Sequence, residues 1–285
     1  MSNSWLGLES DVCVITGAVG GMGSEISREF AKQKAKLVLV DLDEAKCQQF
    51  AAELSKEYGI EAIGLSCNTT NEASVDAAVQ KVKEKFGRCD VLVNTAAILR
   101  FCPLEDLPLD EWNQTINVNM TGYFLMSQRF GRLMIEQKSG RMVHISTVAS
   151  HTPETYSGAY SSTKAAVSMM SKQIAAEWGQ FGIRSNAICP CFVKTPLSKK
   201  FYEDKAVEEG RTRMIASRRI GETMDIANAV LYLASKRSDY SNGTELVVDG
   251  GYEVMLGDLV PRPGGRRQFA IEQHAAAQAA KAAKK

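Results

Sequence analysis

Two residues with complementary chemistry, Tyr160 and Lys164, stand four positions apart in the stretch HISTVASHTPETYSGAYSSTK. A tyrosine with a pKa of about 10 is ionised in only about one molecule in a thousand at neutral pH. A lysine at the i+4 position of a helix lies on the same face, so its positive charge favours the phenolate. Lowering the tyrosine pKa to near neutral requires about 4 kcal/mol of preferential stabilisation of the anion. The pair predicts a tyrosine that exchanges a proton with a substrate.

A second tyrosine, Tyr156, precedes this pair but has Tyr160 rather than a lysine at its i+4 position. It also comes before Gly158, where a helix is not expected to be established. We therefore expect Tyr156 to contact the substrate rather than to act as a base. The other expected substrate contacts are Ser146, His151 and Phe192.

A glycine-rich turn, Thr16 to Gly23 (TGAVGGMG), follows the first apolar run and precedes a helical pattern. Glycines let such a turn tighten and let its backbone approach a pyrophosphate, which then rests on the N–H groups of the helix N-terminus. The expected contacts with a dinucleotide are Gly17, Gly20, Gly21, Met22 and Gly23. Asp41 ends the next apolar run, where a carboxylate accepts hydrogen bonds from ribose hydroxyls and repels a 2′-phosphate. With no arginine or lysine expected nearby, the sequence favours NAD as the cofactor over NADP.

Strand-like and helix-like segments alternate along most of the chain. Apolar runs lie at 12–16, 36–41, 61–66, 89–94, 141–146, 183–189 and 244–248, and helical patterns at 22–34, 43–58, 71–86, 109–136, 158–180 and 222–235. This order predicts an α/β fold, a doubly wound Rossmann-type parallel sheet with helices on both faces, whose ligand lies beyond the carboxyl ends of the strands. We expect a single domain over 1–256, with a charged lid at 193–220, and a C-terminal arm with an Ala/Lys-rich tail at 257–285.

The composition narrows the classes of function. The 285 residues include 34 basic and 33 acidic side chains, for a net charge of +1, which does not indicate binding to nucleic acid or to an anionic membrane. The N-terminal residues lack the pattern of a signal peptide, and no apolar run reaches the length of a membrane span. The seven cysteines are odd in number and dispersed, which predicts reduced thiols and a cytoplasmic protein. Cys189 and Cys191 flank a single proline, which is not the spacing of a zinc pair, so no metal is expected.

Three motifs in this order resemble the short-chain dehydrogenase/reductase family, over about residues 7 to 256. They are TGxxxGxG at 16–23, the Tyr160 and Lys164 pair, and Val248-Asp249-Gly250-Gly251. The resemblance implies that Asn119 holds a water in a proton relay, and that 188–195 embraces the nicotinamide. The further cofactor contacts that it implies are Asp41, Leu42, Asn68, Thr69, Asn94, Ala96, Ala97, Tyr160, Lys164, Pro190, Val193 and Thr195.

Four positions depart from the family pattern. Asn68 replaces an aspartate near the adenine, and Ala97 and Cys191 replace glycines. The catalytic serine of the family lies thirteen residues before the tyrosine, a position that is Thr147 here rather than Ser146. Because neighbours on a strand point to opposite faces, only one of these two hydroxyls enters the site. The spacing favours Thr147, and a one-residue change in the loop would bring in Ser146 instead.

The residues and the resemblance together predict an NAD-dependent oxidoreductase. It would interconvert a secondary alcohol, such as a polyol, a sugar or another polar hydroxy compound, and its ketone by direct hydride transfer, with Tyr160 as acid and base. The departures leave open a catalytically silent NAD(H)-binding sensor or scaffold, and a dehydratase or epimerase with tightly held NAD is a third class. The charged lid is expected to face water rather than an anionic substrate. The resemblance further implies a homo-oligomer, a tetramer or a dimer.

Overall fold

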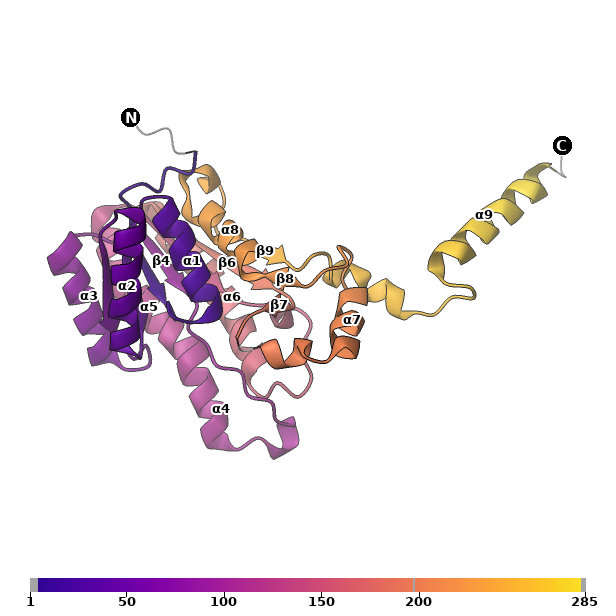
Figure 1. Cartoon of the computed structure of the whole chain (residues 1–285), viewed down its shortest axis with the longest axis horizontal. Coiled ribbons are helices and arrows are strands. Elements are labelled where there is room, and N and C mark those ends of the chain that lie inside the picture. Colours follow the sequence, from indigo (N-terminus) through magenta and orange to yellow (C-terminus); the bar gives the residue numbers. More distant parts are fainter. Residues whose placement is uncertain (1–4, 197, 283–285) are drawn as a thin grey trace.

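The computed structural model describes residues 5–196 and 198–282. Residues 1–4, Leu197 of the expected lid and the last three residues of the expected tail lie outside them. A seven-stranded sheet has the order β3-β2-β1-β4-β5-β6-β9, and all its strands pair in parallel (Figure 1). The strands are β1 (Val12–Thr16), β2 (Lys36–Asp41), β3 (Ala62–Ser66), β4 (Val91–Asn94), β5 (Gly140–Ile145), β6 (Ile183–Pro190) and β9 (Glu245–Val248). The order reverses between β1 and β4, which is the switch point where ligands bind in such sheets.

Helices cover both faces of this sheet, so the predicted fold class is confirmed. The helices are α1 (Gly21–Lys32), α2 (Glu44–Tyr58), α3 (Glu72–Phe86), α4 (Leu109–Ile116), α5 (Gly122–Gln137), α6 (Tyr160–Trp178), α7 (Lys205–Arg213), α8 (Thr223–Ala234) and α9 (Arg266–Ala282). Asp43 and Asn71 cap α2 and α3 by accepting a hydrogen bond from the backbone N–H three residues on. Both helices end at a glycine in the left-handed region, which is the usual way to stop a helix.

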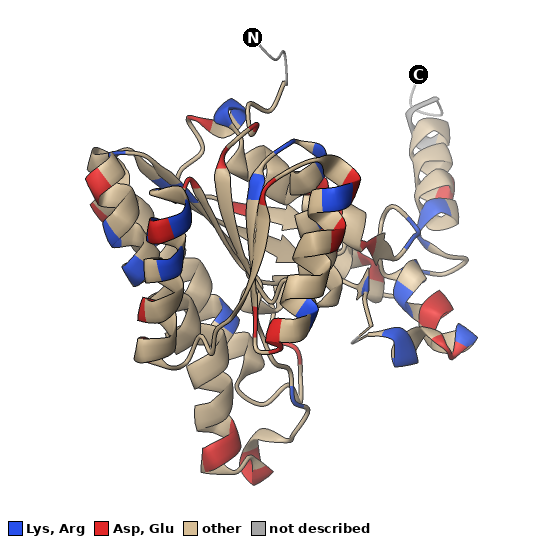
Figure 2. Ribbon diagram, turned by 60° about the vertical axis from the view of Figure 1, so that its left-hand side comes forward, with Lys and Arg blue, Asp and Glu red and all other residues tan. Residues whose placement is uncertain are grey.

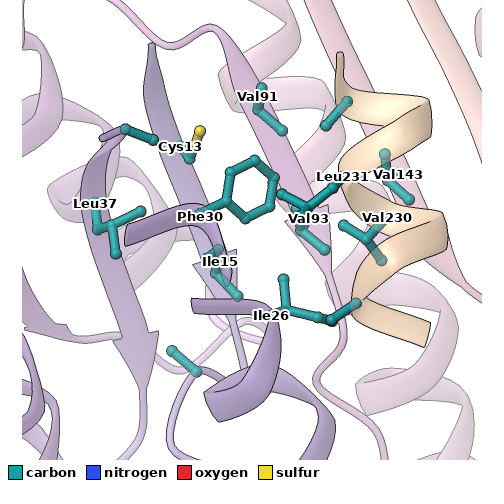
Figure 3. Close-up of a cluster of buried hydrophobic side chains, with 14 of the residues drawn as sticks. Cys13, Ile15, Ile26, Phe30, Leu37, Val91, Val93, Val143, Val230 and Leu231 are labelled. Carbon is teal, nitrogen blue, oxygen red and sulfur yellow. The ribbon is translucent and has the colours of Figure 1, made fainter. Parts of the chain in front are cut away.

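Two hydrophobic clusters hold the layers together. Alternate residues of β1 face opposite sides: Cys13 and Ile15 pack with α1 and α8, whereas Val12 and Val14 pack with α3 and α5. Phe30 of α1 lies fully buried at the centre of the first cluster (Figure 3). Burial of a side chain of this size contributes about 1.5–3 kcal/mol. Strands buried on both faces explain why the apolar runs of the sequence are continuous rather than alternating.

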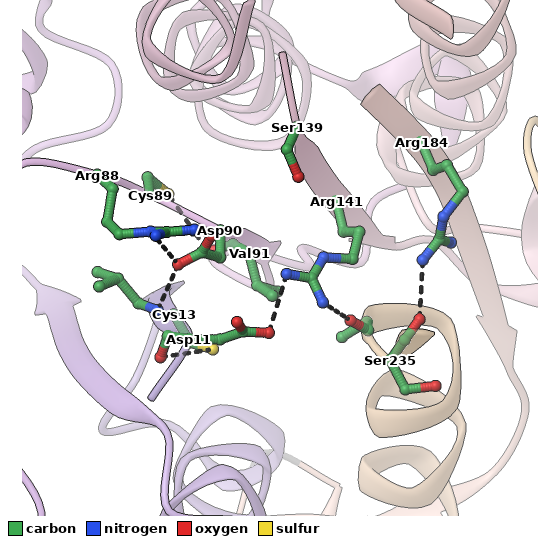
Figure 4. Close-up of polar contacts among 12 residues, drawn as sticks. Asp11, Cys13, Arg88, Cys89, Asp90, Val91, Ser139, Arg141, Arg184 and Ser235 are labelled. Carbon is green, nitrogen blue, oxygen red and sulfur yellow. Dashed lines mark hydrogen bonds and ion pairs between the residues drawn. The ribbon is translucent and has the colours of Figure 1, made fainter. Parts of the chain in front are cut away.

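A polar network lies at the amino ends of the strands, opposite the edge where a ligand would bind (Figure 4). Asp90 accepts a hydrogen bond from the backbone N–H of Val12 at 2.9 Å and pairs with Arg88. Arg141 pairs with Asp11 at 2.9 Å and donates to the carbonyl of Ala234 at 2.9 Å. Asp90, Arg141 and Asp11 are largely buried, so these bonds pair their charges and fix the strand ends rather than serve catalysis.

The helical pattern at 109–136 is confirmed as one continuous helical run, which a π segment divides into α4 and α5. Between α4 and α5 the chain forms a π turn over Asn117–Thr121. Such a turn interrupts the regular hydrogen-bond ladder and is often found at functional sites. It places Asn119 in the interior of the domain, where its side chain is fully buried.

The charged lid contains structure that its sequence did not reveal. It holds a short 3-10 helix, η5 (Lys199–Tyr202), and the helix α7, and its ends are joined by the parallel pair β7 (Val193–Lys194) and β8 (Gly221–Glu222). At the other end of the chain, the 3-10 helix η7 (Glu253–Leu259) takes up the first part of the expected extended arm. The helix α9 follows and extends away from the sheet (Figure 1).

Charges of both signs are interspersed on the outer faces of the helices (Figure 2). None of the helices that the structure describes is both long and apolar enough to cross a membrane.

Candidate active site

The glycine-rich turn between β1 and α1 leaves no room for a side chain at Gly17 or Gly23. An added Cβ at Gly23 would lie 2.1 Å from the carbonyl oxygen of Gly17, and one at Gly17 would lie 2.8 Å from Oγ1 of Thr95. Gly17 also has a φ of +62°, which favours glycine. No side chain caps the N-terminus of α1 at Gly20, so its first N–H groups stay available for an anion. The turn therefore fits the pyrophosphate of a dinucleotide.

Asp41 lies beside this turn at the end of β2. Its carboxylate accepts hydrogen bonds from the backbone N–H groups of Leu42 at 2.8 Å and Val19 at 3.4 Å. Contrary to the expectation from the sequence, a lysine is near: the Lys46 ammonium is 2.9 Å from the carboxylate of Asp43. The hydrogen bond to the Asp43 carboxylate raises the pKa of Lys46, so this lysine is charged and already paired with Asp43. A 2′-phosphate at this position would thus meet the carboxylates of Asp41 and Asp43 as well as Lys46.

The expected adenine contacts, Asn68 and Thr69, follow β3. The side-chain oxygen of Asn68 accepts hydrogen bonds from the backbone N–H and the hydroxyl of Thr70, at 3.0 and 2.8 Å. This oxygen is therefore already used within the loop, and the Asn68 side chain would contact a ligand through its amide N–H groups. Thr69 packs against α5, where an added Cβ on Gly122 would lie 2.7 Å from its hydroxyl oxygen.

The segment after β4 borders the same crevice. The hydroxyl of Thr16 accepts hydrogen bonds from the backbone N–H groups of Thr95 and Ala96 at 3.1 and 3.3 Å, which joins the ends of β1 and β4. Asn94 is buried, and its amide points into the core toward Ser127 and His144, both at 3.2 Å. Any contact of Asn94 with a cofactor would therefore come from its main chain. Ala97 is exposed at the crevice.

The two candidate hydroxyls at the end of β5 face different surroundings. Ser146 is buried, and its hydroxyl donates to the carbonyl of Lys164 at 3.0 Å and accepts from Ser168 at 3.1 Å. Thr147 points to the other side, where its hydroxyl donates to the carbonyl of Pro190 at 3.3 Å and also hydrogen-bonds Tyr160. Ser146 also lines the cavity described below, but both hydrogen-bond partners of its hydroxyl belong to α6.

Tyr160 begins α6, and Lys164 follows on the same face with its ammonium 5.8 Å from the centre of the Tyr160 ring. Burial raises the pKa of Tyr160, the charge of Glu154 adds to this, and the hydrogen bond with Thr147 acts in the opposite direction. Burial also lowers the pKa of Lys164 to about 7. In the protein alone the tyrosine is thus a neutral acid, and a positive charge bound beside it would favour the phenolate.

Lys164 is held by groups that the sequence did not single out. Its ammonium donates to the carbonyl of Ile145 at 2.7 Å and to the hydroxyl of Tyr123 at 3.2 Å. Tyr123 is an α5 residue with an exposed fraction of 2%. Burial, with the charge of Lys164, lowers the pKa of His144 to about 3, so this histidine stays neutral. In the sequence both residues have the pattern of ordinary core positions, and no local signal marks them.

Asn119 supports the loop after β4 from the π turn. Its amide oxygen accepts from the backbone N–H of Ile98 at 2.8 Å, and its amide nitrogen donates to the carbonyl of Ile98 at 2.8 Å and to the hydroxyl of Thr163 at 3.3 Å. The side chain is therefore fully used in positioning this loop against α6. A role in a proton relay would involve its main chain.

A cavity of about 500 Å³ lies beyond the carboxyl end of the sheet, with Thr147 and Tyr160 on its wall. Of the expected contacts, Met22, Ser146, Pro190, Phe192, Val193 and Thr195 also line it. Further lining residues that the sequence reasoning missed are Leu99, Phe101, Phe201, Tyr202, Met214 and Tyr252, and the lining also includes Glu154 and Arg211. The lid thus forms part of the cavity wall.

Arg211 of α7 enters this cavity among aromatic rings. Its guanidinium lies 4.5 Å from the ring centre of Phe201, 4.9 Å from that of Phe192 and 5.5 Å from that of Tyr202. Phe192 has a φ of +40°, an unusual value for a bulky residue that marks backbone strain in this loop. The expectation that the charged lid only faces water is therefore wrong for this one residue.

Two expected substrate contacts do not border the cavity. Tyr156 is 67% exposed, and its carbonyl accepts a hydrogen bond from the backbone N–H of Cys102 at 2.8 Å. His151 turns toward β9 and hydrogen-bonds Glu245 and Glu253. Spacing along the sequence placed both near the catalytic strand, but the turns after β5 direct their side chains away from the cavity.

The fold and the site define a Rossmann-type protein with a glycine-rich turn that fits a dinucleotide and a tyrosine–lysine pair beside a cavity. A family model described as enoyl-(acyl carrier protein) reductase matches residues 17–253. D-threitol dehydrogenase of Mycolicibacterium smegmatis is 36% identical over 247 residues, covering 87% of this chain and 94% of that protein. The 5-keto-D-gluconate 5-reductase of Escherichia coli is 33% identical over 254 residues, covering 89% of this chain and 100% of that protein.

Among solved structures, a gluconate 5-dehydrogenase from Burkholderia cenocepacia, in complex with NADP and tartrate, is similar with a TM-score of 0.84. It is 31% identical in sequence, and the match covers 87% of this chain and 97% of that one. The chain belongs to the short-chain dehydrogenase/reductase family, as the motifs predicted. It is an oxidoreductase that acts on CH–OH groups.

Proposed function

We propose that this protein is an NAD(H)-dependent oxidoreductase that interconverts a polar secondary alcohol and its ketone, with Tyr160 as acid and base. The observation that carries the proposal is the position of Thr147 and Tyr160 together on the wall of the cavity, with Lys164 behind them. The cavity lies at the carboxyl edge of the sheet, on the side of the glycine cradle, where the reactive end of a bound dinucleotide is expected.

The residues of the chain divide the proton chemistry between them. The nicotinamide, when bound, supplies or accepts the hydride. Tyr160 gives its proton to the substrate oxygen in reduction and takes it back in oxidation. Thr147 donates a hydrogen bond to the same oxygen as charge develops on it. Lys164, held by Ile145 and Tyr123, presents its ammonium to the phenolate and stabilises it.

NAD is the proposed cofactor because Asp41 stands at the ribose position with Asp43 close by. A carboxylate there accepts hydrogen bonds from both ribose hydroxyls and repels a 2′-phosphate, and juxtaposed like charges cost several kcal/mol. The similar gluconate 5-dehydrogenase structure holds NADP, so a direct comparison is required. We expect a higher kcat/KM with NAD than with NADP, and a rise with NADP alone when Asp41→Ser removes the carboxylate. An unchanged preference in that variant would contradict the assignment.

The proposed substrates are polyhydroxylated compounds, and a sugar acid fits better than a neutral polyol. The guanidinium of Arg211 is held on its faces by aromatic rings and donates one N–H to the hydroxyl of Tyr202 at 3.4 Å, so its other N–H groups are left for a ligand. A carboxylate is the ligand that these N–H groups bind best. Glu154 also lines the cavity, and its carboxylate is suited to accept hydrogen bonds from substrate hydroxyl groups. The relatives named for threitol and 5-keto-gluconate fall in these same two substrate classes.

A substrate panel with a matched variant tests this choice. Threitol and other polyols form one arm, and gluconate and 5-keto-gluconate form the other, each with NAD(H) and NADP(H). Loss of the charge in Arg211→Met should lower kcat/KM for the acids by about tenfold or more, since one charged hydrogen bond contributes about 1.5–3 kcal/mol, and should spare the polyols. An equal effect on both arms would assign Arg211 to the packing of the lid.

The sensor or scaffold alternative gains no support from the geometry. Neither Ala97 nor Cys191 has a positive φ, so a side chain at these positions does not strain the backbone. Thr147 keeps a hydroxyl at the tyrosine. Binding of NADH without turnover of any member of the panel would revive this alternative.

A further inference from the structure

We propose that His151, Cys189 and Glu245 form a site for a single zinc ion. These residues come from three segments that the fold brings together: the turn after β5, the strand β6 and the first position of β9. One ligand atom from each, an imidazole nitrogen, a thiol sulfur and a carboxylate oxygen, lies within 4.8 Å of the other two. Imidazole, thiolate and carboxylate are the three ligand types that zinc uses in proteins.

The distances suit a small tetrahedral ion. The sulfur of Cys189 is 3.9 Å from Nε2 of His151 and 3.9 Å from Oε2 of Glu245. Around a tetrahedral zinc with bonds of about 2.0–2.3 Å, ligand atoms are separated by roughly 3.3–3.8 Å. Nε2 and Oε2 now share a hydrogen bond, so the ion would take the place of the proton between them and move them slightly apart.

The imidazole of His151 is oriented as in known metal sites. Its Nδ1 lies 2.8 Å from Oε1 of Glu253, which leaves Nε2 directed at Cys189 and Glu245. A histidine that binds a metal usually donates its other ring N–H to a carboxylate in this way, which fixes both its tautomer and its direction. Glu253 therefore plays the part of the outer carboxylate.

The charges around the site balance when zinc is present. The Lys172 ammonium pairs with the second oxygen of Glu245. Together with the zinc ion, this ammonium offsets the negative charges of the Cys189 thiolate and of the Glu245 and Glu253 carboxylates. Binding releases the thiol proton and the proton shared by His151 and Glu245, so atoms and charge are conserved. Lys172 also restricts Glu245 to one ligand oxygen.

The site is reachable from solvent but separate from the substrate cavity. The side chain of His151 is 32% exposed and that of Glu245 is 13% exposed, whereas Cys189 is buried. A water can occupy the fourth position on the exposed side. Cys189 precedes Pro190, whose carbonyl accepts the hydrogen bond of Thr147. The ion would thus join the turn after β5 to β6 and β9 and hold the ends of these strands in place.

Metal binding by the full chain, measured without substrate or cofactor, tests this proposal independently of the proposed reaction. Protein freed of metal by a chelator is titrated with Zn²⁺ by calorimetry, and with Co²⁺ to detect the absorption of a cobalt–thiolate bond. We expect one ion per chain and a thiolate band. Cys189→Ser should abolish the band, and His151→Gln should abolish tight binding. The matched controls Cys102→Ser and His274→Gln should retain both.

A variant of the outer carboxylate gives a graded result. Glu253→Gln should keep one ion per chain but weaken binding by about 10- to 100-fold. Circular dichroism of each variant shows whether it is folded. The proposal is overturned if the folded wild-type protein binds no zinc, or if Cys189→Ser binds zinc and cobalt as the wild type does. In either case His151 serves only in an ion network with Glu245 and Glu253.

Discussion

The assignment of Thr147 rather than Ser146 to catalysis can be tested with two substitutions of nearly equal size. Thr147→Val keeps the shape of the side chain and removes the hydroxyl that faces Tyr160. Loss of one donor to the reacting oxygen costs about 2.7–4 kcal/mol, so kcat should fall by about 10²- to 10³-fold. Thr147→Ser restores the hydroxyl and should restore most of the activity.

Ser146→Ala should lower the stability of the protein and leave its kcat nearly unchanged. It removes the bond to the carbonyl of Lys164 and leaves the buried hydroxyl of Ser168 without its acceptor, which should lower the free energy of unfolding by about 1–3 kcal/mol. Its kcat should stay close to that of the wild type, because the hydroxyl points toward α6. Urea unfolding and steady-state kinetics of the same preparations measure both effects. A large loss of kcat in Ser146→Ala together with normal turnover in Thr147→Val would refute the assignment.

Three further predictions follow from the charges and surfaces of the domain. The charge of Glu154 raises the pKa of Tyr160, so Glu154→Gln should lower that pKa. The pH at which kcat/KM for alcohol oxidation rises should then move to a lower value, and a shift to higher pH would contradict this. Asp90→Ala should lower the free energy of unfolding by about 1–3 kcal/mol in urea, because it leaves a buried backbone N–H without an acceptor, and should leave KM unchanged. Two large apolar side chains are exposed on α5 and α6: Phe124 is 46% and Met169 is 63% exposed. If these helices form the interface of the expected homo-oligomer, replacing both residues with glutamate should yield monomers, as measured by light scattering. An unchanged mass would place any interface elsewhere.

The sequence predicted the order of the strands and helices because their patterns are local. Continuous apolar runs such as 36–41 indicated strands buried on both faces, and helical patterns such as 71–86 indicated the helices between them. The turn at Gly17 and the spacing of Tyr160 and Lys164 are likewise local features. The family and the fold class were correct for this reason.

Features that depend on tertiary packing could not be predicted in the same way. Tyr123 and His144 resemble core residues, and only the fold shows that they surround Lys164. Arg211 looked like one charge among many in the lid until α7 placed it among aromatic rings. The direction of His151 depends on carboxylates about a hundred residues later in the chain, at Glu245 and Glu253. Spacing along the chain carries no information on such contacts.

The central claim is that Tyr160 transfers the substrate proton in an NAD(H)-dependent oxidation or reduction. The most direct measurement compares turnover of an active member of the substrate panel by the wild type and Tyr160→Phe, with NADH affinity titrated in parallel. We predict that the variant binds NADH normally and loses about 10²- to 10⁴-fold in kcat, the usual contribution of a general acid or base. Unchanged turnover by a folded Tyr160→Phe variant would contradict the account.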